Sequence, residues 1–165
     1  MTFTSSYASP LGPLLLASDG DALTGLWLDG QKYYAAGLAE DASEAPSLPL
    51  LRSASDWLDA YFAGDKPDAQ ALKLAPEGSE FQKLVWKLLR DIPYGETTTY
   101  GALAAKAEAC LDRRTSARAV GAAVGRNPIS IIIPCHRVLG AGGCLTGYAG
   151  GLDKKEWLLR FEGAR

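Results

Sequence analysis

The sequence predicts an α+β protein with two small domains, a β-sheet and helix domain in residues 1–76 and a mostly helical domain in residues 77–165. Short strand-like runs separated by turn residues fill the first part of the chain, and capped helical patterns fill the second. A connector rich in Pro, Gly and Asp separates the two kinds of pattern. A chain of 165 residues is long enough for two small domains that each bury a core.

The first domain is expected to begin with three strands at residues 2–9, 13–18 and 22–28. The segments between them contain Pro, Gly and Asp, which favour tight turns, so a meander is expected. A helix is expected at residues 50–62, because apolar residues recur there at helical spacing. No set of residues typical of catalysis is visible in this half, which we interpret as a scaffold.

The second domain is expected to contain a helix-turn-helix. Ser79 and Gln82 form a capping-box pattern that predicts the start of one helix. Two further helices are expected at residues 100–108, capped by Thr98 or Thr99, and at residues 117–125, capped by Thr115 or Ser116. The last of these is rich in Ala and Gly, which suits close approach to another surface. Four arginines lie on or near it, as in helix-turn-helix proteins that bind DNA: Arg113, Arg114, Arg118 and Arg126.

The remaining residues predict a strand, a loop and a final helix. Residues 129–133 are expected to form a buried strand or extended segment. The glycine-rich loop that follows lacks the spacing of a dinucleotide-binding motif, so we expect it to form a pocket wall. The final helix is expected at residues 154–162, with Asp153 as its cap and Glu156 as the reciprocal partner.

The only histidine of the chain, His136, directly follows Cys135. A thiol is a useful nucleophile only as the thiolate, and a neighbouring base or cation is the usual way to reach that state. Adjacent side chains of a regular strand point to opposite faces, but Pro134 lacks an N–H and fixes its φ. We therefore expect the strand to break at Pro134 so that the two groups converge. A buried structural cysteine beside a solvated histidine is the alternative.

Charge and composition narrow the classes of function. Residues 1–75 carry four basic and ten acidic residues, whereas residues 76–165 carry thirteen and nine, which suggests that only the second half meets a polyanion. No apolar run is long enough to span a bilayer, and the N-terminus shows no signal-peptide pattern. Three cysteines without such a signal predict reduced thiols and a cytoplasmic protein, and one histidine without a CxxC motif argues against structural zinc.

In combination, the motifs of the second half resemble the C-terminal domain of O6-alkylguanine-DNA alkyltransferases, also called methylated-DNA–protein-cysteine methyltransferases. The motifs occur in this order: Phe81-x4-Trp86, Ile92-Pro93-x-Gly95-x3-Thr99-Tyr100, Arg118-Ala119-Val120-Gly121, Asn127-Pro128, Ile133-Pro134-Cys135-His136-Arg137-Val138, Gly147-Tyr148 and Lys155-x-Trp157-Leu158-Leu159. Residues 11–28 are similar to the N-terminal domain of the same family. The resemblance implies a ribonuclease H-like fold for the first domain.

The resemblance implies direct reversal of DNA damage by irreversible, single-turnover transfer of an alkyl group from O6-alkylguanine to Cys135 after base flipping. O4-alkylthymine is a second candidate substrate. His136 would take the thiol proton, Glu162 would hold the imidazole tautomer, and Tyr100 would protonate the departing guanine. The expected partner is double-stranded DNA containing O6-alkylguanine. We expect a monomer with no cofactor, no metal and no membrane association.

The same resemblance implies a set of residues that contact DNA or the flipped base: Arg118, Asn127, Arg137, Val138, Tyr148 and Ala149. Arg118 would enter the base stack, with a phosphate contact as the alternative role. Asn127 would couple the recognition helix to the Cys135 turn, with a helix C-cap as the alternative. The carbonyls of Cys135 and Val138 and an amide near Ala149 would read the base edge.

The chain departs from the family pattern at residues 108–114, a stretch that is a few residues longer than usual and contains Arg113 and Arg114. Two other classes of function are also considered. A cysteine hydrolase would use Cys, His and an acid but would turn over, and a non-catalytic lesion-binding protein would lack the nucleophile that Cys135 provides.

Overall fold

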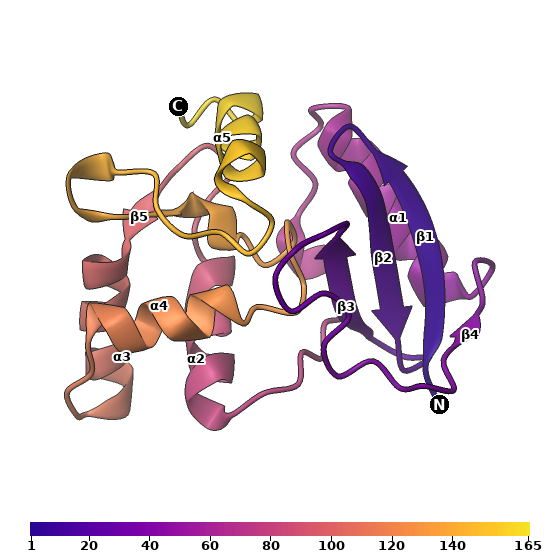
Figure 1. Cartoon of the computed structure of the whole chain (residues 1–165), viewed down its shortest axis with the longest axis horizontal. Helices are drawn as coiled ribbons and strands as arrows, with labels where there is room; N and C mark the ends of the chain where they lie inside the picture. The colour runs from indigo at the N-terminus through magenta and orange to yellow at the C-terminus, as the bar shows by residue number, and fades with distance from the viewer. The chain divides into compact units, whose positions relative to one another are not determined.

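The computed structural model describes all 165 residues and divides into two compact units (Figure 1). The first unit consists of Met1–Glu77 and Pro128–Ser130, and the second of Gly78–Asn127 and Ile131–Arg165. A short segment from within the predicted second domain is therefore part of the first unit. None of the helices combines the length and apolarity needed to cross a bilayer, and the longest has 14 residues.

The first unit is a four-stranded sheet with one helix packed against it. Strands β1 (Phe3–Ser9), β2 (Gly12–Ser18) and β3 (Leu23–Leu28) form the predicted antiparallel meander, and β4 (Ser43–Glu44) adds a parallel strand beside β1. The order across the sheet is β3-β2-β1-β4. Helix α1 (Pro49–Phe62) lies against this sheet and buries the apolar residues that predicted it (Figure 1).

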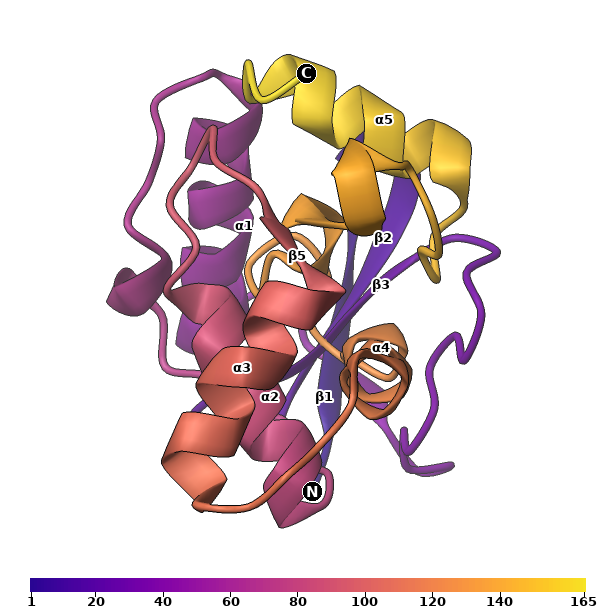
Figure 2. The same ribbon diagram turned by 90° about the vertical axis from the view of Figure 1, so that its left-hand side faces the viewer.

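The second unit contains four helices, and the first three start at predicted caps. Helix α2 (Glu80–Arg90) begins with the complete capping box of Ser79 and Gln82. The side chains of Thr99 and Ser116 cap α3 (Tyr100–Leu111) and α4 (Ala117–Gly125). These three helices pack against one another, and α4 crosses the other two steeply (Figures 1 and 2). The helix-turn-helix expected from the sequence is formed by α3 and α4.

Helix α3 is longer than expected, and α5 begins earlier. The extra residues carry α3 to Leu111, after which Asp112 ends the helix in a left-handed conformation with φ 52°. Helix α5 (Leu152–Phe161) follows Gly151, whose φ of 102° favours glycine. The prediction that Asp153 caps this helix was wrong, because the chain turns at Gly151 and Asp153 already lies inside the first helical turn.

Residues 129–133 do not form the expected strand. Only Ile129 makes a bridge, to Leu26 at the edge of β3 within the first unit. The chain then turns, and Ile131 adopts a left-handed conformation with φ 71° that no extended strand contains. The isoleucines are buried all the same, so their apolar run reflects a packed turn rather than a strand.

A short parallel ladder connects the helix-turn-helix to the segment after His136. Strand β5 (Thr98–Thr99) pairs with β6 (Val138–Leu139), with Thr98 opposite Val138. Tyr100 follows β5 directly, and the Cys-His turn precedes β6 directly. Two residues of ladder thus fix Tyr100 close to Cys135, although 35 positions separate them in the sequence.

Candidate active site

The backbone around Cys135 is held by hydrogen bonds on both sides. Pro134 has φ −82° and ψ 65°, and the Cys135 amide donates to the Ile133 carbonyl over 2.8 Å, which together define an inverse γ-turn. The Asn127 side-chain amide donates to the same carbonyl, also over 2.8 Å. A 3₁₀ turn, Cys135–Arg137, follows at once. Pro134 therefore lies in a tight turn, but it ends no strand, because residues 129–133 form none.

The Cys135 thiol is enclosed, with 4% of the residue exposed. Burial raises the pKa of this thiol, because an enclosed thiolate loses its hydration. The polar side chains of Asn127 and Tyr148 and the charge of Lys155 act in the opposite direction and favour the thiolate. The site therefore holds a thiol whose ionisation depends on its immediate neighbours.

His136 and Glu162 form a buried pair behind this turn. The imidazole Nε2 lies 2.7 Å from the Glu162 Oε2, and both side chains are fully enclosed. Burial lowers the pKa of His136 despite the opposing effect of Glu162, so the imidazole is neutral. The hydrogen-bond network then assigns the proton to Nε2, which donates to the carboxylate. Nδ1 makes no hydrogen bond to another protein group and is left as a proton acceptor.

Arg137 binds the other side of the same carboxylate. Its Nε donates to Glu162 Oε1 over 2.7 Å, its Nη2 to Oε2 over 3.0 Å, and its Nη1 to the Ile92 carbonyl over 2.7 Å. Burial alone would raise the pKa of Glu162, but the hydrogen bonds from His136 and Arg137 and the charge of Arg137 outweigh it and hold that pKa far below its usual range. Arg137 was expected to contact DNA or the base, and its enclosed position does not fit that role.

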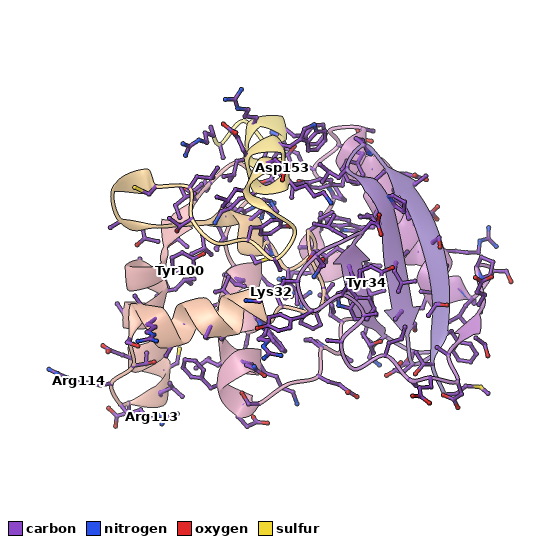
Figure 3. All side chains as sticks on the ribbon, viewed as in Figure 1. Lys32, Tyr34, Tyr100, Arg113, Arg114 and Asp153 are labelled. Carbon is purple, nitrogen blue, oxygen red and sulfur yellow. The ribbon has the colours of Figure 1, made fainter.

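A groove of about 580 Å³ opens beside this cluster within the second unit. Its wall consists of Thr99, Tyr100, Gly101, Ala117, Arg118, Gly121, Ala141, Thr146 and Gly147. The Tyr100 hydroxyl donates to the Thr146 and Gly147 carbonyls over 3.4 and 3.3 Å. Tyr100 stands at the start of α3 (Figure 3). Arg118 is exposed, so the groove combines a phenol with a free guanidinium.

The remaining predicted residues lie around the thiol. Val138 is buried, and its carbonyl accepts a hydrogen bond from Lys155. Tyr148 and Ala149 lie in the loop after Gly147 and are half-buried. Asn127 is buried at the end of α4 and reaches the Cys135 turn. Asn127 and Tyr148 therefore adjoin the thiol, whereas Arg118 lies on the groove and Arg137 lies behind the site.

Lys155 was not identified as a site residue from the sequence, although it is fully buried and points at this cluster. Its position within the motif Lys155-x-Trp157-Leu158-Leu159 was the one available signal. No group of three His, Cys, Asp or Glu side chains is arranged to hold a metal ion. The other two cysteines, Cys110 and Cys144, are free and exposed.

Two family models match the chain. Residues 3–76 match the ribonuclease-like domain of 6-O-methylguanine DNA methyltransferase, and residues 80–164 match its DNA binding domain. The chain is 48% identical over 159 residues to the methylated-DNA–protein-cysteine methyltransferase of Methanosarcina acetivorans, covering 96% of each chain. It is 45% identical over 157 residues to the enzyme of that name from Mycobacterium tuberculosis, covering 95% of this chain and 90% of that protein.

Solved structures agree with these matches. A crystal structure of Mycobacterium tuberculosis OGT in complex with DNA superposes with a TM-score of 0.84 at 43% identity, covering 99% of this chain and 92% of that chain. The expected combination of a ribonuclease-like β-sheet domain and a helical DNA-binding domain is confirmed.

The first prediction concerns acid stability. Because the pKa of Glu162 is lowered in the folded protein, its stabilising contribution is complete above the unfolded pKa of about 4.3 and is lost as pH falls towards the folded pKa. We expect Glu162→Gln to lower the free energy of unfolding at pH 7 by about 3 kcal/mol, because it breaks a buried ion pair. Urea unfolding at pH 7 and at pH 3 should show this deficit shrinking in acid.

The matched control is Glu156→Gln on the same helix, where Glu156 pairs with Arg160 over 2.9 Å at the surface. Exposed pairs of this kind contribute below about 1 kcal/mol, so we expect little change at either pH. A deficit for Glu162→Gln that stays constant between pH 7 and pH 3 would contradict the buried, ionised carboxylate.

Proposed function

The chain belongs to the 6-O-methylguanine DNA methyltransferase family, and on that premise we propose that it repairs O6-alkylguanine by transferring the alkyl group to its own Cys135. Its activity is that of a methylated-DNA–protein-cysteine methyltransferase, acting on O6-methylguanine in DNA. The observation that carries the assignment of Cys135 is its enclosed thiol, which has the His136–Glu162 pair behind it and hydrogen-bond donors beside it.

The proposed reaction begins with ionisation of Cys135. The thiol proton passes to Nδ1 of His136, directly or through one water molecule, and then to solvent. Glu162 holds Nε2 protonated, so that Nδ1 presents its lone pair, and Arg137 holds Glu162 ionised and oriented. The lowered pKa of His136 supports this route, because a neutral imidazole accepts the proton and then releases it readily.

The thiolate then attacks the alkyl carbon in line with the bond to O6. A carbon–sulfur bond forms, the carbon–oxygen bond breaks, and the departing guanine takes a proton at N3 from the Tyr100 hydroxyl, which solvent later restores. Burial raises the pKa of Tyr100, with a further contribution from Cys135, so the hydroxyl retains its proton until guanine leaves. The product is a thioether, which is a very poor leaving group, so we infer one transfer per protein molecule.

The chain binds DNA, and we propose that a duplex carrying the lesion meets the α3–α4 pair. The thiol is too enclosed to reach a base inside the stack, so the damaged nucleotide must be extruded into the groove. Arg118 on α4 would stack on the orphaned partner base. The carbonyls of Cys135 and Val138 and the amide near Ala149 would recognise the base edge. We expect a cytoplasmic monomer, in which the three free thiols stay reduced.

The second prediction is stoichiometric transfer to Cys135. Intact mass should rise by one methyl group, about 14 Da, after incubation with O6-methylguanine duplex DNA, and peptide mapping should place it on Cys135. Cys135→Ser should show no increase. Modification of Cys110 or Cys144, or repeated turnover, would rule out the assignment.

The third prediction separates stacking from phosphate binding at Arg118. If the planar guanidinium fills the stack, Arg118→Ala should slow repair of duplex DNA at least tenfold and leave reaction with free O6-benzylguanine nearly unchanged. Arg118→Lys is the control, since it keeps the positive charge but lacks the planar guanidinium group that could stack on a base. Restoration of duplex repair by lysine would show that Arg118 serves as a phosphate contact.

The fourth prediction concerns the long α3–α4 connection. Glu108 accepts a hydrogen bond from the Thr115 amide over 3.0 Å, which closes the turn, and Arg113 and Arg114 are exposed and point away from the helices (Figure 3). We propose that both bind phosphates beside the lesion and read no sequence. Replacing both with alanine should weaken DNA binding equally across sequences and reduce the salt slope by about two units.

The control for the arginine pair is the double variant Lys32→Ala, Arg52→Ala. These exposed residues lie in the first unit, and the variant changes the net charge by the same amount. We expect this control to keep the wild-type salt slope. A wild-type slope for the Arg113, Arg114 variant would identify the connection as a surface insertion without a role in binding.

A further inference from the structure

Lys155 is a buried cation without a carboxylate partner. The residue has no exposed surface, and its Nζ donates to the carbonyls of Val138, Thr146 over 2.7 Å and Gly147 over 3.1 Å. None of the ion pairs of the protein includes it. Carbonyl dipoles replace part of its hydration but leave its charge uncompensated. Burying an unpaired ammonium group is costly, so a compensating charge is expected nearby.

The one buried carboxylate of this interior, that of Glu162, already has other partners. Glu162 accepts hydrogen bonds from Arg137 and lies against His136, which is neutral. The buried charges are therefore two cations, Arg137 and Lys155, and one anion. One negative charge is missing.

Cys135 is the group that can supply this charge. Lys155 and Cys135 interact electrostatically, each favouring the ionised form of the other. The other groups that face the pair carry no net charge: the Tyr100 ring lies 5.8 Å from the Lys155 Nζ, the Tyr148 side chain is a phenol that acts on the thiol, and His136 is neutral. Burial lowers the pKa of Lys155 to about 8, so it is mainly protonated at pH 7.

We propose that Lys155 is the counter-ion of the Cys135 thiolate, a positioning residue that makes an enclosed cysteine ionisable. Ionisation transfers the thiol proton through His136 to solvent. The positive charges of Arg137 and Lys155 then balance the negative charges of Glu162 and the thiolate. The three carbonyl contacts hold the ammonium in place, so the charge is fixed before DNA arrives. This inference rests on the proposed function only in taking Cys135 as the nucleophile, and its test requires no DNA.

The test measures the rate at which iodoacetamide alkylates Cys135 as a function of pH, by quantitative mass mapping of the Cys135 peptide. Cys110 and Cys144 are replaced by serine throughout. Lys155→Met and Lys155→Gln remove the charge, and Gln keeps a hydrogen-bond donor. We expect the midpoint of the rate profile to rise by at least about one pH unit in both variants, and the rate at pH 7 to fall about tenfold.

Lys154→Met is the matched control, because it removes the neighbouring lysine of the same helix and should leave the midpoint unchanged. Circular dichroism verifies that each variant is folded. A purely structural role would alter absolute rates through access and leave the midpoint in place. A wild-type midpoint in the folded Lys155→Gln variant overturns the inference, whether or not the midpoint of Lys155→Met also stays at the wild-type value.

A reciprocal measurement needs no change at Lys155. Cys135→Ser removes the ionisable partner, so the Lys155 ammonium should titrate at a pH lower than in the wild type, followed by NMR of its 13C-labelled ε-methylene group. If Lys155 titrates at the same pH in Cys135→Ser as in the wild type, the proposal that Lys155 is the counter-ion is also overturned. Failure of the proposed function would give a different result. Wild-type Cys135 would then react normally with iodoacetamide but would accept no methyl group from DNA.

Discussion

The buried carboxylate of Glu162 is the constraint on which the rest of the site depends. One residue at the end of α5 accepts from His136 on one oxygen and from Arg137 on both, so it fixes two consecutive side chains of the Cys135–Arg137 turn. Arg137 in turn reaches the Ile92 carbonyl after α2. A single desolvated anion thus ties three separate parts of the second unit together, and its two strong partners keep it ionised despite burial.

The site balances two opposing demands. Burial raises the pKa of Cys135 and so opposes formation of the thiolate that the proposed reaction needs. Helix α5 supplies a charged residue near each of its ends, Lys155 near its start and Glu162 directly after its last residue. The short β5–β6 ladder adds Tyr100 to the same cluster. In the proposed function, the reactivity of Cys135 therefore depends on the charges around a buried sulfur and not on exposure of the sulfur to solvent.

Asn127 joins helix α4 to the interior of the second unit. It follows Arg126, the C-cap of α4, and donates to the Ile133 carbonyl, so the helix that carries Arg118 is joined to the turn that carries Cys135. The small residues of α4 allow close packing, since the Trp86 indole bonds to the Ala123 carbonyl over 2.8 Å and Gly121 lies beneath the Tyr100 ring. In the proposed function, a contact of α4 with DNA would therefore be linked through one side-chain hydrogen bond to the turn that carries Cys135.

Local patterns in the sequence were enough to predict the three strands, the cap at Ser79, the caps at Thr98 or Thr99 and at Thr115 or Ser116, and the Cys-His turn, because each depends mainly on near neighbours in the sequence. Only the tertiary structure decided the rest. The sequence predicted a DNA or base contact for Arg137 and no site role for Lys155, because the groups that hold them, Glu162 and the Val138 carbonyl, lie 25 and 17 positions away. The isoleucine run reads as a strand, yet the Asn127 hydrogen bond and the φ of Ile131 make it a turn. Periodicity in the sequence indicates which residues are buried. The partner of each buried charged residue depends on contacts between residues that lie far apart in the sequence.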